Sequence, residues 1–248
     1  MSVLYGIHAV TEALKSDSGK IERICVQRGQ KNPRVREIIE LGRRKNLRIS
    51  FEEKSWLDRK AGGQRHQGVL CYMEELPAAN VEEILDVAPS PGLLVVLDGI
   101  EDPHNLGAIL RSAEVSGAGG VILPQRRNAG LSASVMKASA GAASHIRVGR
   151  VANIARLIDL LKQRGYWIVG LAAESEHPIW ETDLSSPTAL VLGNEGKGLH
   201  RLVREKCDFL VSIPIRGSLQ SHNVSVAAGI ALYEAVRQRS HASSNQLK

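Results

Sequence analysis

The sequence predicts an α/β protein with a small N-terminal domain and a larger C-terminal domain built on a parallel sheet. Two observations predict it. Short runs that are apolar on nearly every residue alternate with helix-length segments, and a proline-containing stretch at 77–92 interrupts that pattern. Strands that are apolar on both faces are typical of parallel sheets covered by helices. We therefore expect domains at 1–76 and 93–240, joined by a linker at 77–92.

The first 76 residues show a short alternation of strand-like and helical patterns. We expect strands at 21–26, 48–51 and 69–73, and helices at 7–15 and 33–45. This order predicts a small α/β domain.

The second domain has longer helical segments between its apolar runs. We expect strands at 93–97, 120–123, 167–171, 189–192 and 210–213. The clearest covering helices are expected at 105–116, 153–163 and 224–237. The polar end of the sequence, 241–248, is predicted to be a disordered tail.

The net charge of +6 is concentrated in the first domain. Residues 1–76 carry 15 Lys and Arg against 10 Asp and Glu, a net of +5, whereas residues 77–248 carry 17 against 16, a net of +1. This asymmetry permits a polyanionic partner on the N-terminal domain, with 43–45 and 59–60 as candidate basic contacts, although charge runs are also typical of ordinary solvated surfaces. Aromatic residues make up only 4%, which argues against a surface that stacks many unpaired bases.

Composition also indicates the compartment. No apolar run approaches the ~18 residues of a membrane span, and the first residues lack the basic-then-apolar order of a signal peptide, so we expect a cytoplasmic protein. Cys25, Cys71 and Cys207 are far apart and form no CxxC pair. We therefore expect buried, reduced thiols and neither a zinc site nor a disulfide framework.

Ligands of open parallel sheets bind beyond the C-terminal ends of the strands, and three predicted loops there are unusual. In the first, Asn105 precedes a helix that carries Arg111 six residues later. Taken alone, Asn105 fits the N-cap of this helix as well as it fits a ligand-binding role. Arg111 lies among apolar residues, so its guanidinium either extends to solvent or is held for an anion.

The other two loops are rich in glycine and in polar side chains. The loop at 193–198 places three glycines around Glu195 and Lys197, a pattern typical of a tight turn that also allows close approach of a ligand. It is not a Walker A loop, and no dinucleotide fingerprint follows a strand. The loop at 213–225 contains more hydrogen-bonding side chains than helix capping by Asn223 or Ser225 requires.

Taken in this order, the three loops resemble the motifs of the SpoU-type RNA ribose methyltransferases of the SPOUT superfamily. The motifs read N-L-G-A-I-L-R at 105–111, L-G-N-E-G-K-G at 192–198 and S-I-P-I-R-G-S-L-Q-S-H-N-V-S-V-A-A-G at 212–229. In addition, Y-G-I-H-A-V at 5–10 and H-Q-G-V at 66–69 are similar to the N-terminal domain of the branch that methylates guanosine riboses of 23S rRNA.

The resemblance implies an L30e-like RNA-binding domain followed by a SPOUT domain with a deep trefoil knot. It implies S-adenosylmethionine as cofactor, no metal, and a homodimer whose active site is completed across the subunit interface. The expected substrate is 23S rRNA, free or in a ribosomal precursor particle. The residues that match the family's catalytic positions are Asn105, Arg111, Glu195, Ser221 and Asn223. The backbone positions that match its cofactor contacts are Gly193, Ile213 and His222.

Methyl transfer to a ribose hydroxyl requires in-line approach and removal of a proton. A guanidinium keeps its proton in proteins, so we expect Arg111 to hold the adjacent phosphate and stabilise the developing alkoxide. Glu195 is the more ordinary proton acceptor, unless it only orients its neighbours, and the sequence leaves this choice open. No Asp or Arg is obviously placed for either end of the cofactor, so backbone contacts from the three loops are expected to bind it.

His222 stands where the family usually has leucine. Contact through the backbone alone would tolerate the change, whereas packing of the side chain on the adenine would make the pocket more polar and cofactor affinity pH-dependent. Other functions also stay open at this point. They are a SpoU enzyme acting on tRNA or another rRNA nucleotide, and a catalytically silent RNA-binding homologue. A nicotinamide oxidoreductase is a third alternative, and the absence of a dinucleotide fingerprint after a strand argues against it.

Overall fold

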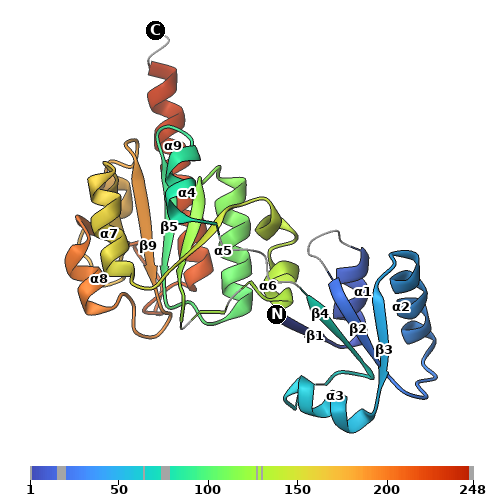
Figure 1. The fold of residues 1–248 in the computed structure, drawn as a ribbon. Helices are drawn as coiled ribbons and strands as arrows, with labels where there is room; N and C mark the ends of the chain where they lie inside the picture. The colour runs from blue at the N-terminus through green and yellow to red at the C-terminus, as the bar shows by residue number, and fades with distance from the viewer. Residues whose placement is uncertain are drawn as a thin grey trace.

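The protein's structure, a computed structural model, describes residues 2–15, 21–63, 65–73, 79–126, 128–129 and 131–245. It contains two α/β domains, so the expected fold class is confirmed (Figure 1). Helix α6 (Ala133–Ala138) of the larger domain contacts α1 (Ile7–Lys15) of the smaller one. Within the described part of the chain, no helix has both the length and the apolar character needed to cross a bilayer.

The N-terminal domain is a mixed four-stranded sheet with helices on both faces. Its order is β1-β4-β2-β3, in which β2 and β3 are parallel and β4 is antiparallel to both of its neighbours. Helices α1 and α2 pack on one face and α3 packs on the other. The strands are β1 (Ser2–Tyr5), β2 (Ile21–Gln27), β3 (Arg48–Glu52) and β4 (Val69–Met73), and the further helices are α2 (Pro33–Arg44) and α3 (Lys54–Ala61).

The C-terminal domain contains a six-stranded sheet in which all neighbouring strands are parallel. Its order is β10-β8-β9-β5-β6-β7. Five of these strands are predicted by apolar runs. The sixth, β7, lies at the edge of the sheet, and Gly149 and Arg150 interrupt the apolar run that would have predicted it. The strands are β5 (Leu93–Asp98), β6 (Gly120–Pro124), β7 (Val148–Val151), β8 (Trp167–Leu171), β9 (Thr188–Gly193) and β10 (Phe209–Val211).

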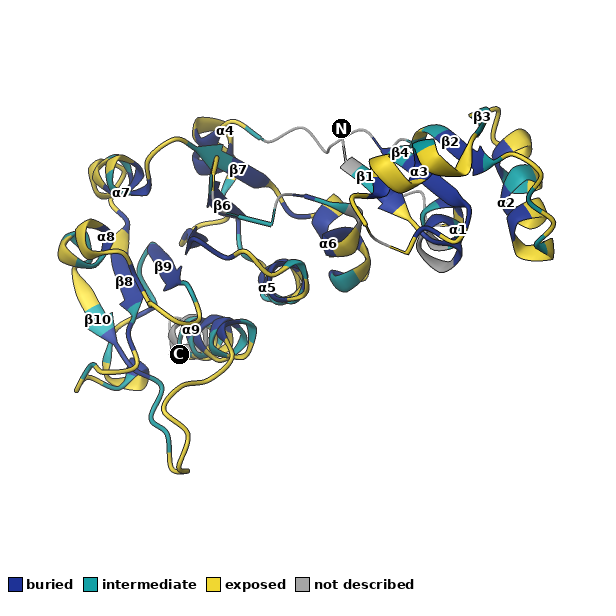
Figure 2. Cartoon of the chain, turned by 90° about the horizontal axis from the view of Figure 1, so that it is seen from below, coloured by how far each residue is buried: buried dark blue, intermediate teal, exposed yellow. Residues whose placement is uncertain are grey.

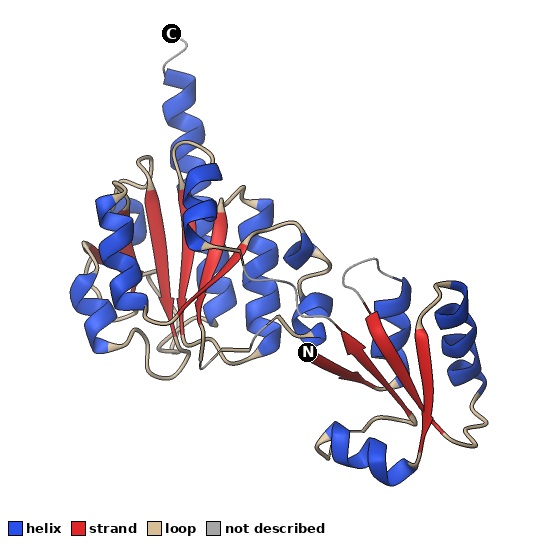
Figure 3. Ribbon diagram, viewed as in Figure 1, coloured by secondary structure: helices blue, strands red, loops and turns tan. Residues whose placement is uncertain are grey.

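Two helical layers cover this sheet (Figures 2 and 3). Strand β5 shows why, because Leu93, Val95 and Leu97 face one layer while Leu94 and Val96 face the other. None of the five is more than 3% exposed. This burial on both sides is what the fully apolar runs predict. The first layer contains α5 (Pro103–Val115) and α9 (Val224–Asn245), and the second contains α4 (Val81–Val87), α7 (Ile154–Gln163) and α8 (Arg201–Lys206).

The described part of the expected linker packs on the C-terminal domain. The backbone N–H of Ala79 donates to the carbonyl of Val148 at 2.9 Å, and α4 follows at once. Val81, Ile84 and Leu85 form one apolar face of α4, and a one-sided helix of this kind is stabilised by packing on a sheet. Residues 77 and 78 lie outside the described residues.

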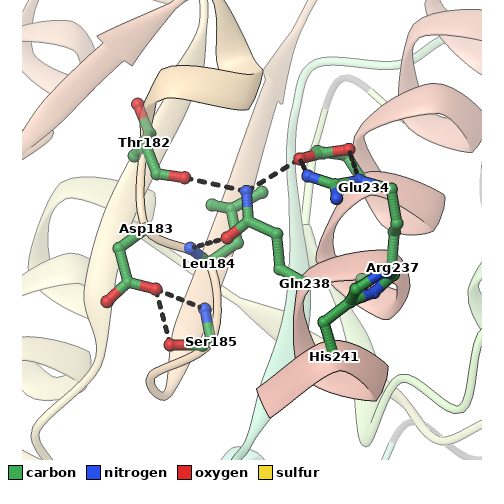
Figure 4. A network of polar contacts seen from close by, with 8 residues as sticks. All are labelled: Thr182, Asp183, Leu184, Ser185, Glu234, Arg237, Gln238 and His241. Carbon is green, nitrogen blue, oxygen red and sulfur yellow. Dashed lines mark hydrogen bonds and ion pairs between the residues drawn. The ribbon is translucent and has the colours of Figure 1, made fainter. Parts of the chain in front are cut away.

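Helix α9 continues through Asn245, so it includes residues 241–245 of the expected tail. Gln238 fixes this half of the helix to the chain before β9 (Figure 4). Its Oε1 accepts from the N–H of Leu184 at 2.7 Å, and its Nε2 donates to the carbonyl of Thr182 at 3.0 Å. Arg239 adds bonds to the carbonyls of Pro91, Gly92, Leu184 and Ser186. These contacts anchor the helix beyond its apolar part, and residues 246–248 lie outside the described residues.

Candidate active site

A cavity of about 360 Å³ lies at the C-terminal ends of β8, β9 and β10. This is the edge of a parallel sheet where ligands are expected, and the volume lies within the usual range for small-molecule sites. Glu195 and Ser221, which match catalytic motif positions, line the cavity. So do the three residues that match cofactor positions, Gly193, Ile213 and His222. The structure therefore brings two loops separated in sequence to one cavity.

The wall formed by the loop after β9 requires glycine. A Cβ atom on Gly193 would lie 2.1 Å from the carbonyl carbon of Gly198, so no larger residue fits there. The backbone of Asn194 exchanges two hydrogen bonds with Gly198, at 3.0 and 2.8 Å, which closes the loop. The tight-turn interpretation of this loop is correct, and it is compatible with a ligand at its outer side.

Asn194 fixes the orientation of this loop through its side chain. Its Nδ2 donates to the carbonyl of Gly99 at 3.0 Å, and its Oδ1 accepts from the N–H of Gly196 at 3.0 Å. Asn194 and Gly196 flank Glu195 in the sequence. The short loop that carries Glu195 is thus tied to the loop after β5.

Three motif side chains meet in one hydrogen-bonded cluster. The Nδ2 of Asn105 donates to Oε1 of Glu195, and the Nδ2 of Asn223 donates to Oδ1 of Asn105 at 3.0 Å. Asn223 also reaches Oε1 of Glu195 at 3.4 Å. We name Asn105, Glu195 and Asn223 the amide–carboxylate cluster. It joins one residue from each of the three loops that the sequence singles out.

Helix capping sets the orientation of Asn223. Its Oδ1 accepts from the N–H of Ser225 at 2.9 Å and from the N–H of Val226 at 3.4 Å, at the start of α9. With the oxygen held by the helix N-terminus, the amide nitrogen faces Asn105 and Glu195. Capping and the cluster are therefore two roles of the same side chain.

Asn105 does not cap α5. That role belongs to Asp102, whose carboxylate accepts from the N–H groups of His104 and Asn105 at 3.2 and 3.3 Å. Asn105 lies in the first turn of α5 and is only 7% exposed. Its side chain is consequently free of a capping role and available to the cluster.

Arg111 lies apart from the amide–carboxylate cluster of its own chain. Six residues along an α-helix correspond to about 600°, which places Arg111 roughly 120° around α5 from Asn105. Arg111 is exposed and makes no hydrogen bond or ion pair with any described residue. Of the sequence's two alternatives, the described chain shows the one in which the guanidinium faces solvent.

Glu174 and Arg204 are lining residues of the cavity that no motif indicates. Glu174 follows β8, Arg204 belongs to α8, and their side chains form an ion pair at the cavity. A hydrogen bond from its own backbone N–H and one from Arg204 lower the pKa of the Glu174 carboxyl. The sequence shows no Asp or Arg obviously placed for the cofactor, and the structure adds Arg204 to the cavity, because α8 brings its guanidinium to the loop after β8.

Ser221 and His222 line the cavity from the segment before α9, and both are exposed. No described residue hydrogen-bonds to either side chain. The His222 imidazole is thus available to a ligand, in addition to its backbone.

The two candidate basic groups of the N-terminal domain do not form a single patch. Arg43, Arg44 and Lys45 are exposed at the end of α2, whereas Arg59 and Lys60 are exposed at the end of α3. Because α2 and α3 cover opposite faces of the sheet, the two groups lie on different sides of this domain.

Comparison with known families agrees with this geometry. A model described as the SpoU rRNA Methylase family matches residues 92–233, which is more than half of the chain. The chain belongs to the SpoU rRNA methylase family. A second model, described as RNA 2'-O ribose methyltransferase substrate binding, matches residues 3–79 of this SpoU protein.

Relatives of this SpoU protein match it over nearly their full length. It is 44% identical over 239 residues to the 23S rRNA (guanosine-2'-O-)-methyltransferase RlmB of Ralstonia nicotianae, with 96% of each chain covered. Its identity to the protein of the same name from Pseudomonas syringae pv. tomato is 42% over 240 residues, again with 96% of each chain covered.

Solved structures of methyltransferases share the fold. AviRb from Streptomyces viridochromogenes in complex with the cofactor AdoMet aligns with a TM-score of 0.68 at 26% identity, covering 96% of this chain and 90% of AviRb. The AdoMet-bound rRNA methyltransferase of Sinorhizobium meliloti aligns with a TM-score of 0.66 at 26% identity, covering 95% of this chain and 87% of that enzyme.

Proposed function

We propose that the protein transfers a methyl group from S-adenosylmethionine to the 2′-hydroxyl of a guanosine in 23S rRNA. The observation that carries the proposal is the amide–carboxylate cluster, which joins one residue from each of the three motif loops beside a cavity. Curated relatives at 42–44% identity across 96% of the chain are named for this activity.

The cavity suits S-adenosylmethionine, which AviRb and the S. meliloti enzyme bind. The close approach of Gly193 to Gly198 brings backbone to the β9 side of the cavity, beside the side chains of Glu195 and Lys197, and an adenine edge can meet amides and carbonyls there. The Glu174–Arg204 pair supplies a carboxylate for hydroxyl or ammonium groups and a guanidinium for a carboxylate. When bound, the cofactor supplies a sulfonium-activated methyl group.

Glu195 is the proposed acceptor of the ribose proton. Both amides of the cluster donate to its Oε1, and no described residue donates to its Oε2. One carboxylate oxygen is thus positioned by Asn105 and Asn223, while the other is left to accept from a substrate hydroxyl. A proton acceptor must lie within hydrogen-bonding reach of the hydroxyl, and rigid positioning of the carboxylate favours that geometry.

We propose that Arg111 acts in the active site of a second copy of the chain. Arg111 and Val115 are four residues apart on α5, and Val115 is 59% exposed. Val226, Ile230 and Tyr233 follow at helical spacing on α9 and are 50%, 38% and 54% exposed. Helices α5 and α9 contact each other, so these exposed apolar side chains lie on two adjacent helices. Exposed apolar side chains on neighbouring elements are expected where a subunit docks.

In such a homodimer, Arg111 would lie beside apolar side chains rather than in open solvent. Its role is to hold the phosphate next to the target ribose and to stabilise the developing alkoxide, because a guanidinium keeps its proton. The N-terminal domain, which carries most of the positive charge, is proposed to dock the rRNA. The trefoil knot expected from the family resemblance stays a prediction.

Methyl transfer from labelled S-adenosylmethionine to separate RNAs tests this function. We expect incorporation into 23S rRNA, and none into 16S rRNA or tRNA at equal concentration. Incorporation into tRNA or another rRNA instead would contradict the proposed substrate but agree with the proposed reaction. Absence of transfer to every RNA, with the cofactor bound, would favour a silent RNA-binding homologue.

A further inference from the structure

A second cavity, of about 570 Å³, lies at the C-terminal ends of β5 and β6, beside the N-terminal ends of α7 and α8. Aliphatic side chains form much of its lining, with Pro124, Ile154 and Leu202 among them. Its polar groups include those of His200 and Arg126. None of these five residues belongs to the amide–carboxylate cluster.

His200 is held in this cavity by a buried carboxylate. Asp98, only 6% exposed, accepts from the backbone N–H of His200 at 2.8 Å and lies 2.9 Å from its Nδ1. A carboxylate can only accept, so Nδ1 carries the proton and Nε2 is the ring nitrogen left for a ligand. The imidazole is half exposed and is thus presented, in a fixed orientation, to whatever occupies the cavity.

Leu202 gives the second cavity an exposed apolar side, and Arg126 gives it an exposed polar side. Leu202 is 54% exposed although Val203 beside it is buried. Arg126 is exposed and has no hydrogen bond or ion pair with the described residues. A nucleobase has this same division, with apolar faces and a polar edge, and Arg matches the two acceptors on the Hoogsteen edge of guanine.

A continuous surface connects this cavity with the proposed cofactor site. A third cavity, of about 460 Å³, shares Gly99 and His200 with the second cavity and shares residues 194 and 197–199 with the first. Lys197 on this surface is exposed and forms no ion pair with any described residue. A phosphate that links two nucleotides would meet a lysine ammonium there.

We propose that the second cavity binds the base of an unpaired nucleotide next to the methylated guanosine. Leu202 contacts the face of the base, His200 and Arg126 contact its edge, and Lys197 contacts the linking phosphate. The inference rests on the proposed function, because it assumes that RNA enters the neighbouring site. It adds a site for a second nucleotide, through which the enzyme recognises the sequence around its target.

RNA affinity, which does not depend on methyl transfer, tests the proposal. Three variants are compared with the wild type for equilibrium binding to a 23S rRNA transcript: Leu202→Ser, Arg126→Ala and His200→Asn. His200→Asn keeps a donor for Asp98 and removes the ring. We expect each dissociation constant to rise about tenfold, the size of one lost base contact, while affinity for S-adenosylmethionine stays unchanged.

Arg201→Ala is the matched control. Arg201 lies between His200 and Leu202, but its side chain pairs with Glu205 at 2.7 Å and does not line the second cavity. We expect wild-type RNA affinity for this variant. Wild-type RNA affinity in all three cavity variants, or an equal loss in the control, would overturn the proposal. Failure of the wild type to methylate RNA that it binds would instead contradict the proposed function alone.

Discussion

The side-chain amide of Asn223 donates to Oδ1 of Asn105 at 3.0 Å, across 118 positions of the chain. This bond joins the start of α9 to the first turn of α5, and both side chains donate to the same oxygen of Glu195. The position of the carboxylate therefore depends on two helix N-termini from opposite ends of the domain. Substitution of Asn223 can separate its capping role from its role in the cluster.

Asn223→Ser should lose activity without losing stability. Serine can still cap α9, but its hydroxyl is too short to replace the amide that reaches Asn105 and Glu195. We expect kcat to fall about 100-fold, because the carboxylate is no longer positioned. Asn223→Ala should show the same kinetic loss and also lower the free energy of unfolding by about 1 kcal/mol, since the cap is removed. Steady-state kinetics with thermal unfolding measures both, and wild-type kcat in Asn223→Ser would contradict the cluster's role.

Arg111→Lys should keep more activity than Arg111→Ala. If Arg111 stabilises negative charge, a lysine ammonium supplies part of that effect, whereas alanine removes it and lowers kcat/KM by about 100-fold or more. The pH profile of kcat/KM should not shift in Arg111→Lys, because no base has been exchanged. Complete and equal inactivity of both variants would count against charge stabilisation. Mixing either variant with Glu195→Gln tests the dimer, since one restored site is expected only if the residues come from different subunits.

Glu174→Gln should weaken cofactor binding and leave kcat at saturating cofactor unchanged. Glu174 pairs with Arg204 at the cavity and is well exposed, so we expect a loss of about fivefold in affinity, as for an exposed ion pair. Its pKa is lowered, so its contribution is fully present above the ordinary pKa of glutamate and is lost only as pH falls through the lowered value. The dissociation constant of Glu174→Gln for S-adenosylmethionine, divided by that of the wild type, should therefore be constant between pH 8 and 5.5.

Glu176→Gln is the control for that measurement. Glu176 is exposed two residues further on and does not line the cavity. The affinity of the Glu176→Gln variant for S-adenosylmethionine should equal that of the wild type. A similar loss in both variants would assign the effect to the general charge of this loop.

His222→Leu tests whether the imidazole contacts the cofactor. The side chain lines the cavity without a partner among the described residues, so we expect it to contact the cofactor and its replacement to change cofactor affinity. Equilibrium binding of S-adenosylmethionine to the leucine variant and to the wild type measures this. Identical binding curves for the two proteins would show that position 222 serves the cofactor through its backbone alone.

The thiols provide a check on the fold itself. Burial raises the pKa of Cys71 to about 12 and that of Cys207 to about 11. At pH 8 the thiolate fraction is therefore very small, and alkylation of the native protein should be much slower than that of the protein in denaturant. Mass spectrometry after a timed iodoacetamide pulse measures this. Rapid native alkylation of Cys71 would contradict its position in the core of the N-terminal domain.

The sequence predicts those parts of the site that depend on local pattern. Fully apolar runs locate the central strands, and the polar loops that follow them contain Asn105, Glu195 and Asn223. The ends of parallel strands share one edge, so the convergence of these loops follows from topology. The hydrogen bonds between them do not, because they depend on side-chain directions set by the caps at Asp102 and Asn223.

Other features depend on tertiary contacts that leave no local pattern. Arg204 reaches the cavity only because α8 packs beside the loop after β8, and Glu174 is one acid in a polar segment. The polar residues after 240 indicate a disordered tail, yet Gln238 and Arg239 anchor the helix that continues to Asn245. Gly149 and Arg150 obscure the edge strand β7.

Mapping the methyl group in 23S rRNA tests the proposed reaction and the role of Glu195 together. The wild type and Glu195→Gln are incubated with unmodified 23S rRNA and labelled S-adenosylmethionine, and the product is digested and analysed by mass spectrometry. We expect one 2′-O-methylguanosine with the wild type and at least about 100-fold slower formation with Glu195→Gln, although both proteins bind the cofactor. A methyl group on a base, or equal rates for the two proteins, would contradict this expectation.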